Sequence, residues 1–227
     1  MIRLENINVV GWEAAIRGMR NPMNSWEKSD SIFCHADGEC HDITLHSSPS
    51  LEEKGTIIVG ENDHDLMMRL AKAGSVDAKY RRMLVVYVDI TAPLYWWKEF
   101  DTYKVGTVAN SCSTMHKIHA KEFTLDDFSV EHLTEENKQI FAEHFLSVLN
   151  KARDNFLASN DKVWWWQMIH SLPSSYNQKR TIMLNYEVLA GIYPNRRGHK
   201  LDEWHDFCSW IETLPYSEII TLSVSNI

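Results

Sequence analysis

The segment at residues 106–114 carries the residue types from which an anion site could be built. It contains Gly-Thr-Val-Ala-Asn-Ser-Cys-Ser-Thr, a glycine turn followed by a stretch that we expect to be helical. Amide and hydroxyl donors in the first turns of a helix bind anions. Tyr103-Lys104 just before the segment and His116-Lys117 just after it could add positive charge. The pattern indicates a phosphate site, although the capped start of an ordinary helix would have similar residues.

Two short basic patches form a second group of candidates. They are Lys179-Arg180 and Arg196-Arg197-Gly198-His199-Lys200, and together they hold five of the 23 Lys and Arg residues. Arginine can bind a phosphate or a carboxylate through two parallel hydrogen bonds, which lysine cannot do. The patches therefore favour a second anion-binding region, with a solvated helix end as the alternative.

The cysteines give two weaker patterns. Cys34 and Cys40-His41, with His35 and His46 nearby, contain metal-binding residue types. Structural zinc sites usually pair their ligands at closer spacing and need a second pair elsewhere, so a loop with incidental thiols is the better interpretation. Cys112 precedes His116 by four residues, which would put both on one helical face as a possible nucleophile pair. A small, partly buried side chain is the better interpretation of Cys112.

The composition is that of a globular protein and excludes several classes. The chain has 227 residues, 44% hydrophobic and 24% charged, and a net charge of −8. That charge argues against a nucleic-acid polymer as partner. No apolar run is long enough for a membrane span, and the first residues lack the order of a signal peptide. Four scattered cysteines do not form a disulfide framework. We therefore expect a cytoplasmic protein with no membrane partner.

The nine tryptophans include two adjacent groups, Trp96-Trp97 and Trp164-Trp165-Trp166. Neighbouring side chains on a helix point roughly 100° apart, so they cannot all enter one core. Some of them must line a groove, meet another subunit or cover a flat ligand. A core position combined with an oligomer contact is the simplest interpretation.

The elements that must position these residues follow from apolar spacing, caps and breakers. The best strand is at residues 83–90, where β-branched and aromatic residues predominate. Asp63 is expected to cap a helix that Gly74 ends, and Thr134 to cap a long one. The predicted helices cover about 64–73, 95–103, 110–119, 135–156, 162–171, 177–192 and 200–212. Residues 1–60 are expected to be irregular, with short strands near 41–46 and 56–59.

These elements predict an α+β fold in a single domain, 1–227. We divide it into an irregular N-terminal part at 1–60, a strand and central-motif region at 61–130, and a helical part at 131–213. No repeat, low-complexity tract or clean linker separates these parts.

In this order, the candidate clusters resemble the motifs of the flavin-dependent thymidylate synthases. That family has an R-H-R motif leading into A-S-x-N-E-x-S-x-R-Y, and downstream L-P, an asparagine and a nucleotide-binding arginine. Here Leu172-Pro173 precede Asn185 at a similar distance, and Arg196 falls where the arginine is expected. Residues 110–113, Asn-Ser-Cys-Ser, resemble N-E-x-S. The stretch from His199 to Trp204 is similar to the family's closing motif, so the resemblance covers about residues 60–212.

The resemblance implies a mixed sheet with a layer of long helices, and a homotetramer. It implies methylation of dUMP to dTMP with FAD, NADPH and methylenetetrahydrofolate. The nucleotide-binding residues would be Arg196, Lys104, Ser111 and Ser113. The cofactor-binding residues would be Asn185, Tyr103, Asn110, His116 and Trp97. It assigns no catalytic side chain, because the flavin carries the chemistry.

The central motif departs from the family at several positions. The R-H-R triplet becomes Tyr103-Lys104-Val105, the glutamate becomes Ser111, and the closing Arg-Tyr becomes Met115-His116. Each lost charge-assisted hydrogen bond is worth about 1.5–3 kcal/mol. Either other cations supply the contacts, or the ligand has changed. The substitutes available are Arg81, Arg82, Lys117 and Arg180.

Two functions therefore stay open. The first is a divergent flavoenzyme of this kind that acts on a pyrimidine nucleotide. The second is a non-catalytic module on the same scaffold that binds or sequesters a nucleotide. If no nucleotide binds, an unrelated helical interaction protein is the remaining hypothesis.

Overall fold

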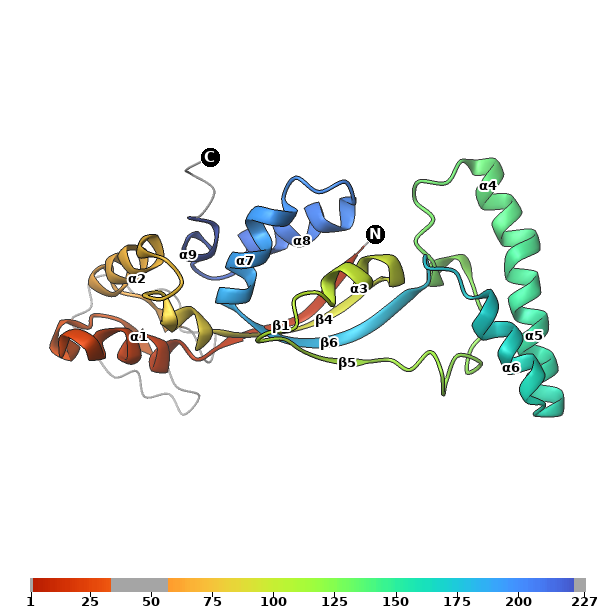
Figure 1. Cartoon of the computed structure of the whole chain (residues 1–227), viewed down its shortest axis with the longest axis horizontal. Coiled ribbons are helices and arrows are strands. Elements are labelled where there is room, and N and C mark those ends of the chain that lie inside the picture. The colour runs from red at the N-terminus through yellow and green to blue at the C-terminus, as the bar shows by residue number, and fades with distance from the viewer. Residues whose placement is uncertain (1, 34–56, 223–227) are drawn as a thin grey trace.

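The structure, a computed structural model, describes residues 2–33 and 57–222 (Figure 1). Its strands are β1 (Arg3–Val10), β2 (Ile32–Phe33), β3 (Ile57–Ile58), β4 (Val85–Pro93), β5 (Val108–Ser111) and β6 (Asn177–Asn185). Its α-helices are α1 (Trp12–Arg20), α2 (Glu61–Ala73), α3 (Leu94–Phe100), α4 (Glu135–Ile140), α5 (Leu146–Ser159), α6 (Lys162–Ser171), α7 (Tyr186–Arg196), α8 (Asp202–Glu212) and α9 (Glu218–Thr221). A π-helical segment, η5 (Phe141–Phe145), joins α4 to α5, and the 3-10 helix η3 (Lys79–Arg82) precedes β4.

A four-stranded antiparallel sheet forms the centre, in the order β1-β4-β6-β5. In β4, β-branched residues alternate with polar ones, and Val86, Val88 and Ile90 are fully buried on one face. This period of two is what a half-buried strand requires. The predicted strand at residues 83–90 is confirmed, shifted toward the C-terminus by two to three residues.

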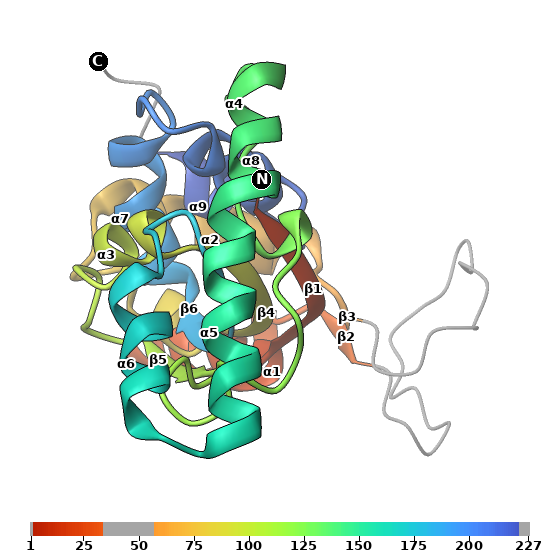
Figure 2. The same ribbon diagram turned by 90° about the vertical axis from the view of Figure 1, so that its right-hand side faces the viewer.

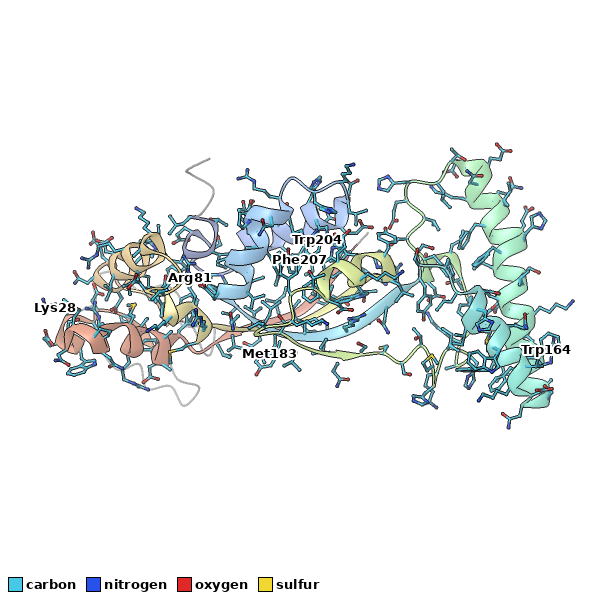
Figure 3. All side chains as sticks on the ribbon, viewed as in Figure 1. Lys28, Arg81, Trp164, Met183, Trp204 and Phe207 are labelled. Carbon is cyan, nitrogen blue, oxygen red and sulfur yellow. The ribbon has the colours of Figure 1, made fainter. Side chains whose placement is uncertain are left out.

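Helices α3, α7 and α8 lie against one face of this sheet, and the main core is between them (Figure 1). Its centre is aromatic. Trp96 stacks on Phe100 with ring centroids 5.0 Å apart and lies 4.8 Å from the Trp204 ring. The figure with side chains places Trp204 and Phe207 above the sheet and Met183 on the opposite side (Figure 3). None of the described helices covers that opposite face, where Tyr87 is 45% exposed.

A helical arm, residues 135–171, stands at one end of the sheet (Figure 2). Its helices α5 and α6 pack side by side around a second, smaller core. Thr134 caps α4 by accepting a hydrogen bond from the Asn137 amide, and α6 has the predicted bounds. The arm therefore confirms the expected layer of long helices.

Two predicted helices are wrong. Residues 110–119 are not helical, because β5 ends at Ser111 and turns follow. Residues 177–185 form the strand β6, and only the second half of the predicted helix is helical, as α7. In β6, Gln178, Ile182 and Leu184 are buried toward the helices. Pairing with β4 and β5 outweighs the helix preference of the Gln-Lys-Arg stretch, so the part at 131–213 is not wholly helical.

The N-terminal part is more ordered than predicted. Residues 1–60 contain β1 and α1, so the expectation of irregular structure is wrong there. The short strand near 56–59 corresponds to β3. The expected strand at 41–46 and the Cys34–Cys40–His41 group lie outside the described residues. In the described part of the chain no group of three or more His, Cys, Asp or Glu residues is arranged to hold a metal ion.

Helix α2 begins at a different residue from the one expected. Gly60 is the N-cap, and Asp63 is the third residue of the helix with a fully buried side chain. The end at Gly74 is confirmed, with a φ of 110° that suits glycine. No helix within residues 2–33 or 57–222 has the length and apolar character that a membrane crossing demands.

Candidate functional site

A cavity of about 330 Å³ lies where α3 ends and the chain turns toward β5. Phe100 closes the helix, Tyr103 and Lys104 form the turn, and Ala109 belongs to the edge strand. The residues that line the cavity are Phe100, Asp101, Tyr103, Lys104, Thr107 and Ala109. This is the segment in which the sequence predicted a phosphate site.

Gly106 shapes the turn. Its φ of +77° is in the left-handed region, which favours glycine. A Cβ atom at this position would lie 3.1 Å from Asn185 Nδ2 and 3.1 Å from Val188 Cγ2. Asn185 is the N-cap of α7, and its Oδ1 accepts a hydrogen bond from the Val188 amide at 3.0 Å. The turn is therefore packed closely against the start of α7, which fixes the position of the cavity.

Two polar groups at the cavity are not committed to the fold. Thr107 Oγ1 is buried without a hydrogen-bond partner among the described residues. Lys104 is exposed and forms no ion pair within that same part of the chain. A buried hydroxyl without a partner is costly, and it is the kind of group that a ligand can satisfy. A hydroxyl and an ammonium at one cavity suit an anionic ligand.

Arg196 lies beside this cavity, held by contacts within the chain. Its Nε donates to Tyr103 Oη at 2.8 Å, and Nη1 donates to Glu99 Oε2 at 2.7 Å. Its guanidinium lies over the Trp204 ring, 4.6 Å from the centroid. The structure thus brings together the predicted site residues Tyr103 and Arg196, and adds a carboxylate that neutralises the arginine.

Arg180 has a similar arrangement, with a carboxylate of the cavity lining and a tryptophan ring as its partners. Its guanidinium lies 4.1 Å from the centroid of the Trp97 ring, and Nη1 donates to Asp101 Oδ1 at 2.7 Å. Trp97 is 1% exposed and donates through Nε1 to the Gln178 carbonyl. The expectation that Trp97 contacts a cofactor is therefore corrected, because its ring belongs to the core and one face is covered by Arg180.

The remaining predicted residues do not converge on one point. Asn110 pairs with Thr181 and Ser111 with Arg180, so their side chains point to opposite faces of β5. Ser113 Oγ accepts hydrogen bonds from the amides of Met115 and His116, which commits it to a local turn. The helical anion site predicted at 106–114 is thereby replaced by a turn and an edge strand.

Three of the cations named as substitutes have no contact with the cavity lining among the described residues. Arg81 is buried, and its Nη1 lies 3.4 Å from Glu187 Oε2 near the start of α7. Arg82 donates to the Ser75 carbonyl at 3.4 Å, and Lys117 is exposed beyond β5. Among these cations and Arg196, within the described residues, Arg180 and Arg196 are the two that contact the cavity lining, through Asp101 and Tyr103.

Sequence reasoning missed Glu99 and Thr107 as site residues. Glu99 is the penultimate residue of α3 and follows an aromatic run that is typical of a buried core segment. Thr107 was included only as part of the glycine turn. The one available signal for Glu99 was a carboxylate on the same short segment as Tyr103 and Lys104.

Comparison with known proteins gives a result in structure alone. No protein-family model matches the chain, and no curated protein sequence matches it. Thymidylate synthase X (ThyX) from Helicobacter pylori, solved with FAD and dUMP, matches with a TM-score of 0.66 and 15% identity over 96% of this chain and 95% of that one. A second structure, flavin-dependent thymidylate synthase ThyX from Helicobacter pylori complexed with FAD and dUMP, matches with a TM-score of 0.61 and 16% identity over 95% and 96%.

This chain has the ThyX fold. The likeness spans nearly the full length of both chains, and it confirms the α+β class with a small antiparallel sheet and long helices. At 15–16% identity the likeness concerns the fold. Two residues of the cavity lining, Tyr103 and Lys104, belong to the triplet that was compared with the R-H-R motif.

Proposed function

We propose that this chain is a flavoprotein that binds FAD and a pyrimidine nucleotide and catalyses the conversion of dUMP to dTMP or a related reaction. The observation that carries the proposal is the cavity beside Lys104 and Thr107, in a chain whose whole length has the ThyX fold. The two ThyX structures of that fold were solved with FAD and dUMP.

The residues present fit the phosphate of a nucleotide. Lys104 supplies a charge that no described carboxylate neutralises, and Thr107 Oγ1 supplies a hydroxyl that has no partner in the described chain. A cavity of about 330 Å³ is at the small end of the roughly 300–1,000 Å³ that ligand sites usually occupy. It therefore suits a mononucleotide, and a dinucleotide such as FAD needs further surface outside it.

We propose that a second copy of this chain supplies that surface, in a homo-oligomer such as a tetramer. The open face of the sheet supports this proposal. Val10, Tyr87 and Val108 are 39%, 45% and 58% exposed, and exposed apolar sheet faces are typical of surfaces that pack against a partner. No described helix covers this face (Figure 1).

The chain's own residues would bind and orient. Lys104 would neutralise the phosphate, and the Thr107 hydroxyl would donate a hydrogen bond to a phosphate oxygen. Gly106 would allow the close approach of the turn to Asn185. Bound flavin supplies hydride transfer, and the protein supplies position and electrostatics. Complete turnover would also use NADPH and methylenetetrahydrofolate, as the family resemblance implies.

A second candidate is a module that binds a nucleotide without catalysis. It is favoured by the pairing of the two arginines beside the cavity lining. Arg196 is neutralised by Glu99 and Arg180 by Asp101, so neither offers an unpaired charge to a second phosphate group. A protein that had lost FAD but kept one nucleotide would have this arrangement.

A thermal-shift titration separates the two candidates. A ligand that binds the native state raises the melting temperature by mass action. We expect both FAD and dUMP to raise it, and Lys104→Ala and Thr107→Val to reduce the shift caused by dUMP. Lys72→Ala, an exposed lysine on α2, is the matched control and should leave both shifts unchanged. Stabilisation by dUMP alone favours the binding module, and no shift with either ligand contradicts both.

A further inference from the structure

Three nitrogen atoms from separate side chains surround one oxygen of Glu99, beside the cavity. Arg196 Nη1 donates to Glu99 Oε2 at 2.7 Å, and Trp204 Nε1 donates to the same atom at 3.0 Å. His199 Nε2 lies 3.2 Å from it. Arg196 ends α7, His199 follows in the connecting loop and Trp204 belongs to α8, whereas Glu99 comes from α3. One oxygen thus occupies a point at which guanidinium, indole and imidazole nitrogens meet.

The orientation of His199 is set by a contact that does not involve Glu99. The backbone amide of Leu201 donates to His199 Nδ1 at 3.2 Å. Because Nδ1 accepts, the neutral ring carries its proton on Nε2, which faces the Glu99 oxygen. All three nitrogens therefore bear hydrogen toward this point.

Arg196 and Trp204 are also held independently of Glu99. Arg196 Nε donates to Tyr103 Oη, and its guanidinium lies over the Trp204 ring. Trp204 is fully buried in the aromatic core. Donors that are fixed before a ligand arrives give a preorganised anion site, since little ordering is needed on binding.

Glu99 is the least fixed member of the group. Its side chain is 34% exposed, compared with 17% for Arg196 and 25% for His199. Its second oxygen, Oε1, accepts no hydrogen bond from residues 2–33 or 57–222. A change of side-chain rotamer would break the three contacts of Oε2 and no contact of Oε1, and it would move the carboxylate to solvent.

We propose that Arg196, His199 and Trp204 extend the phosphate site at Lys104 and Thr107, to which Arg196 is linked through Tyr103, and that Glu99 is an internal occupant which the phosphate must displace. The choice of a nucleotide phosphate as ligand rests on the proposed function. A phosphate oxygen has the same charge sign and acceptor character as the Glu99 oxygen that it would replace. Since only the fraction of molecules with Glu99 displaced can bind, the apparent affinity is lowered by that fraction.

The test is calorimetric titration of the full chain with inorganic phosphate, dUMP and deoxyuridine, in the wild type and in Glu99→Gln. The glutamine is isosteric and can still accept from Trp204, but it carries no charge to compete with phosphate. We expect phosphate and dUMP to bind at least about threefold more tightly to Glu99→Gln, in keeping with a partly exposed ion pair. Deoxyuridine, which lacks the phosphate, should show no such gain. The double variant Glu99→Gln/Arg196→Gln should lose the gain.

The control for net charge is Glu135→Gln, on a glutamate of the helical arm that is 90% exposed. It changes the net charge equally and should leave phosphate binding unchanged. Equal tightening in Glu135→Gln, or unchanged, weaker or absent phosphate binding in Glu99→Gln, would overturn the proposal. Because phosphate is titrated without FAD, a gain in Glu99→Gln would stand even if the wild type bound no flavin.

Discussion

Two arginine–carboxylate pairs in this molecule have nearly the same length and different surroundings. Arg20 Nε lies 2.6 Å from Asp63 Oδ1, and Arg196 Nη1 lies 2.7 Å from Glu99 Oε2. The side chains of the first pair are 4% and 0% exposed, and those of the second are 17% and 34% exposed. The distances alone would give both pairs the same role.

Their hydrogen bonds separate them. Asp63 also accepts from the hydroxyls of Ser29 and Ser31 and from the amides of Asp30 and Ser31, so both of its oxygens are used. Glu99 uses one oxygen and leaves the other open. A buried pair with every acceptor satisfied holds α1, α2 and the chain between them together. A half-open pair can exchange its carboxylate for a ligand, which is why we assign binding to the second pair.

The largest expected effect is that of Asp63→Asn. This change leaves the Arg20 guanidinium buried without its charge partner, which typically costs about 3–5 kcal/mol of stability. Equilibrium denaturation in urea measures it. Glu13→Gln, which removes an exposed pair with Arg17, is the matched control and should change stability by less than about 0.5 kcal/mol. Similar losses in the two variants would contradict the distinction by burial.

The same pair should make stability depend on pH. Burial raises the pKa of Asp63, but hydrogen bonds from Ser31, Ser29 and Arg20 together hold it below its ordinary value of 3.8. A depressed carboxyl pKa stabilises the fold above pH 3.8, and this contribution is lost as the pH falls further. The difference in unfolding free energy between wild type and Asp63→Asn should therefore shrink on acidification below pH 3.8. A difference that stays constant would contradict this role.

Gly106→Ala tests the close packing of the turn at the cavity against the start of α7. The alanine would have to adopt a left-handed backbone conformation, and its Cβ would press on Asn185 and Val188. The left-handed conformation alone should lower the stability of the fold by about 1–2 kcal/mol. Gly74→Ala is a useful comparison, since its φ is also positive at 110° but no atom lies within 4 Å of the new Cβ. If packing at the turn matters, Gly106→Ala should lose more stability than Gly74→Ala and should also weaken dUMP binding.

The smallest stability effect is expected for Glu99→Gln. A partly exposed pair contributes only about 0–1 kcal/mol, so the melting temperature should change little while phosphate binding tightens. The two variants Asp63→Asn and Glu99→Gln would then differ in kind: one loses stability and the other gains affinity. A loss of stability in Glu99→Gln as large as in Asp63→Asn would show that this pair also holds the fold together.

The sequence predicted those elements whose signals are local. The β-branched run of β4 and the helix at 162–171 each depend on residues within about ten positions, and both were predicted. The strands β5 and β6 were not predicted, because they form by pairing: β6 pairs with β4, and β5 pairs with β6. Such pairing between distant segments cannot be deduced from the strand preferences of single residues.

The same reason limits prediction of the site. Tyr103, Lys104 and Arg196 were predicted as site residues through motif spacing and the family resemblance, and their binding role stays a prediction. Glu99 was not, because its partners Arg196 and Trp204 lie 97 and 105 positions away along the chain. Trp97 was assigned to a cofactor through the family resemblance, although a core position with an oligomer contact was the simplest interpretation of the adjacent tryptophans. Both Trp96 and Trp97 are buried, because the sheet lies on one side of α3 and α8 lies on another.

The visible absorption spectrum of the purified protein tests the central claim most directly. A chain with the ThyX fold that acts as a flavoprotein should be yellow, either as purified or after FAD is added and excess removed. The cofactor released on denaturation should be FAD, at about one per chain. A colourless protein that retains no added FAD would contradict the flavoprotein assignment and leave the nucleotide-binding module in its place.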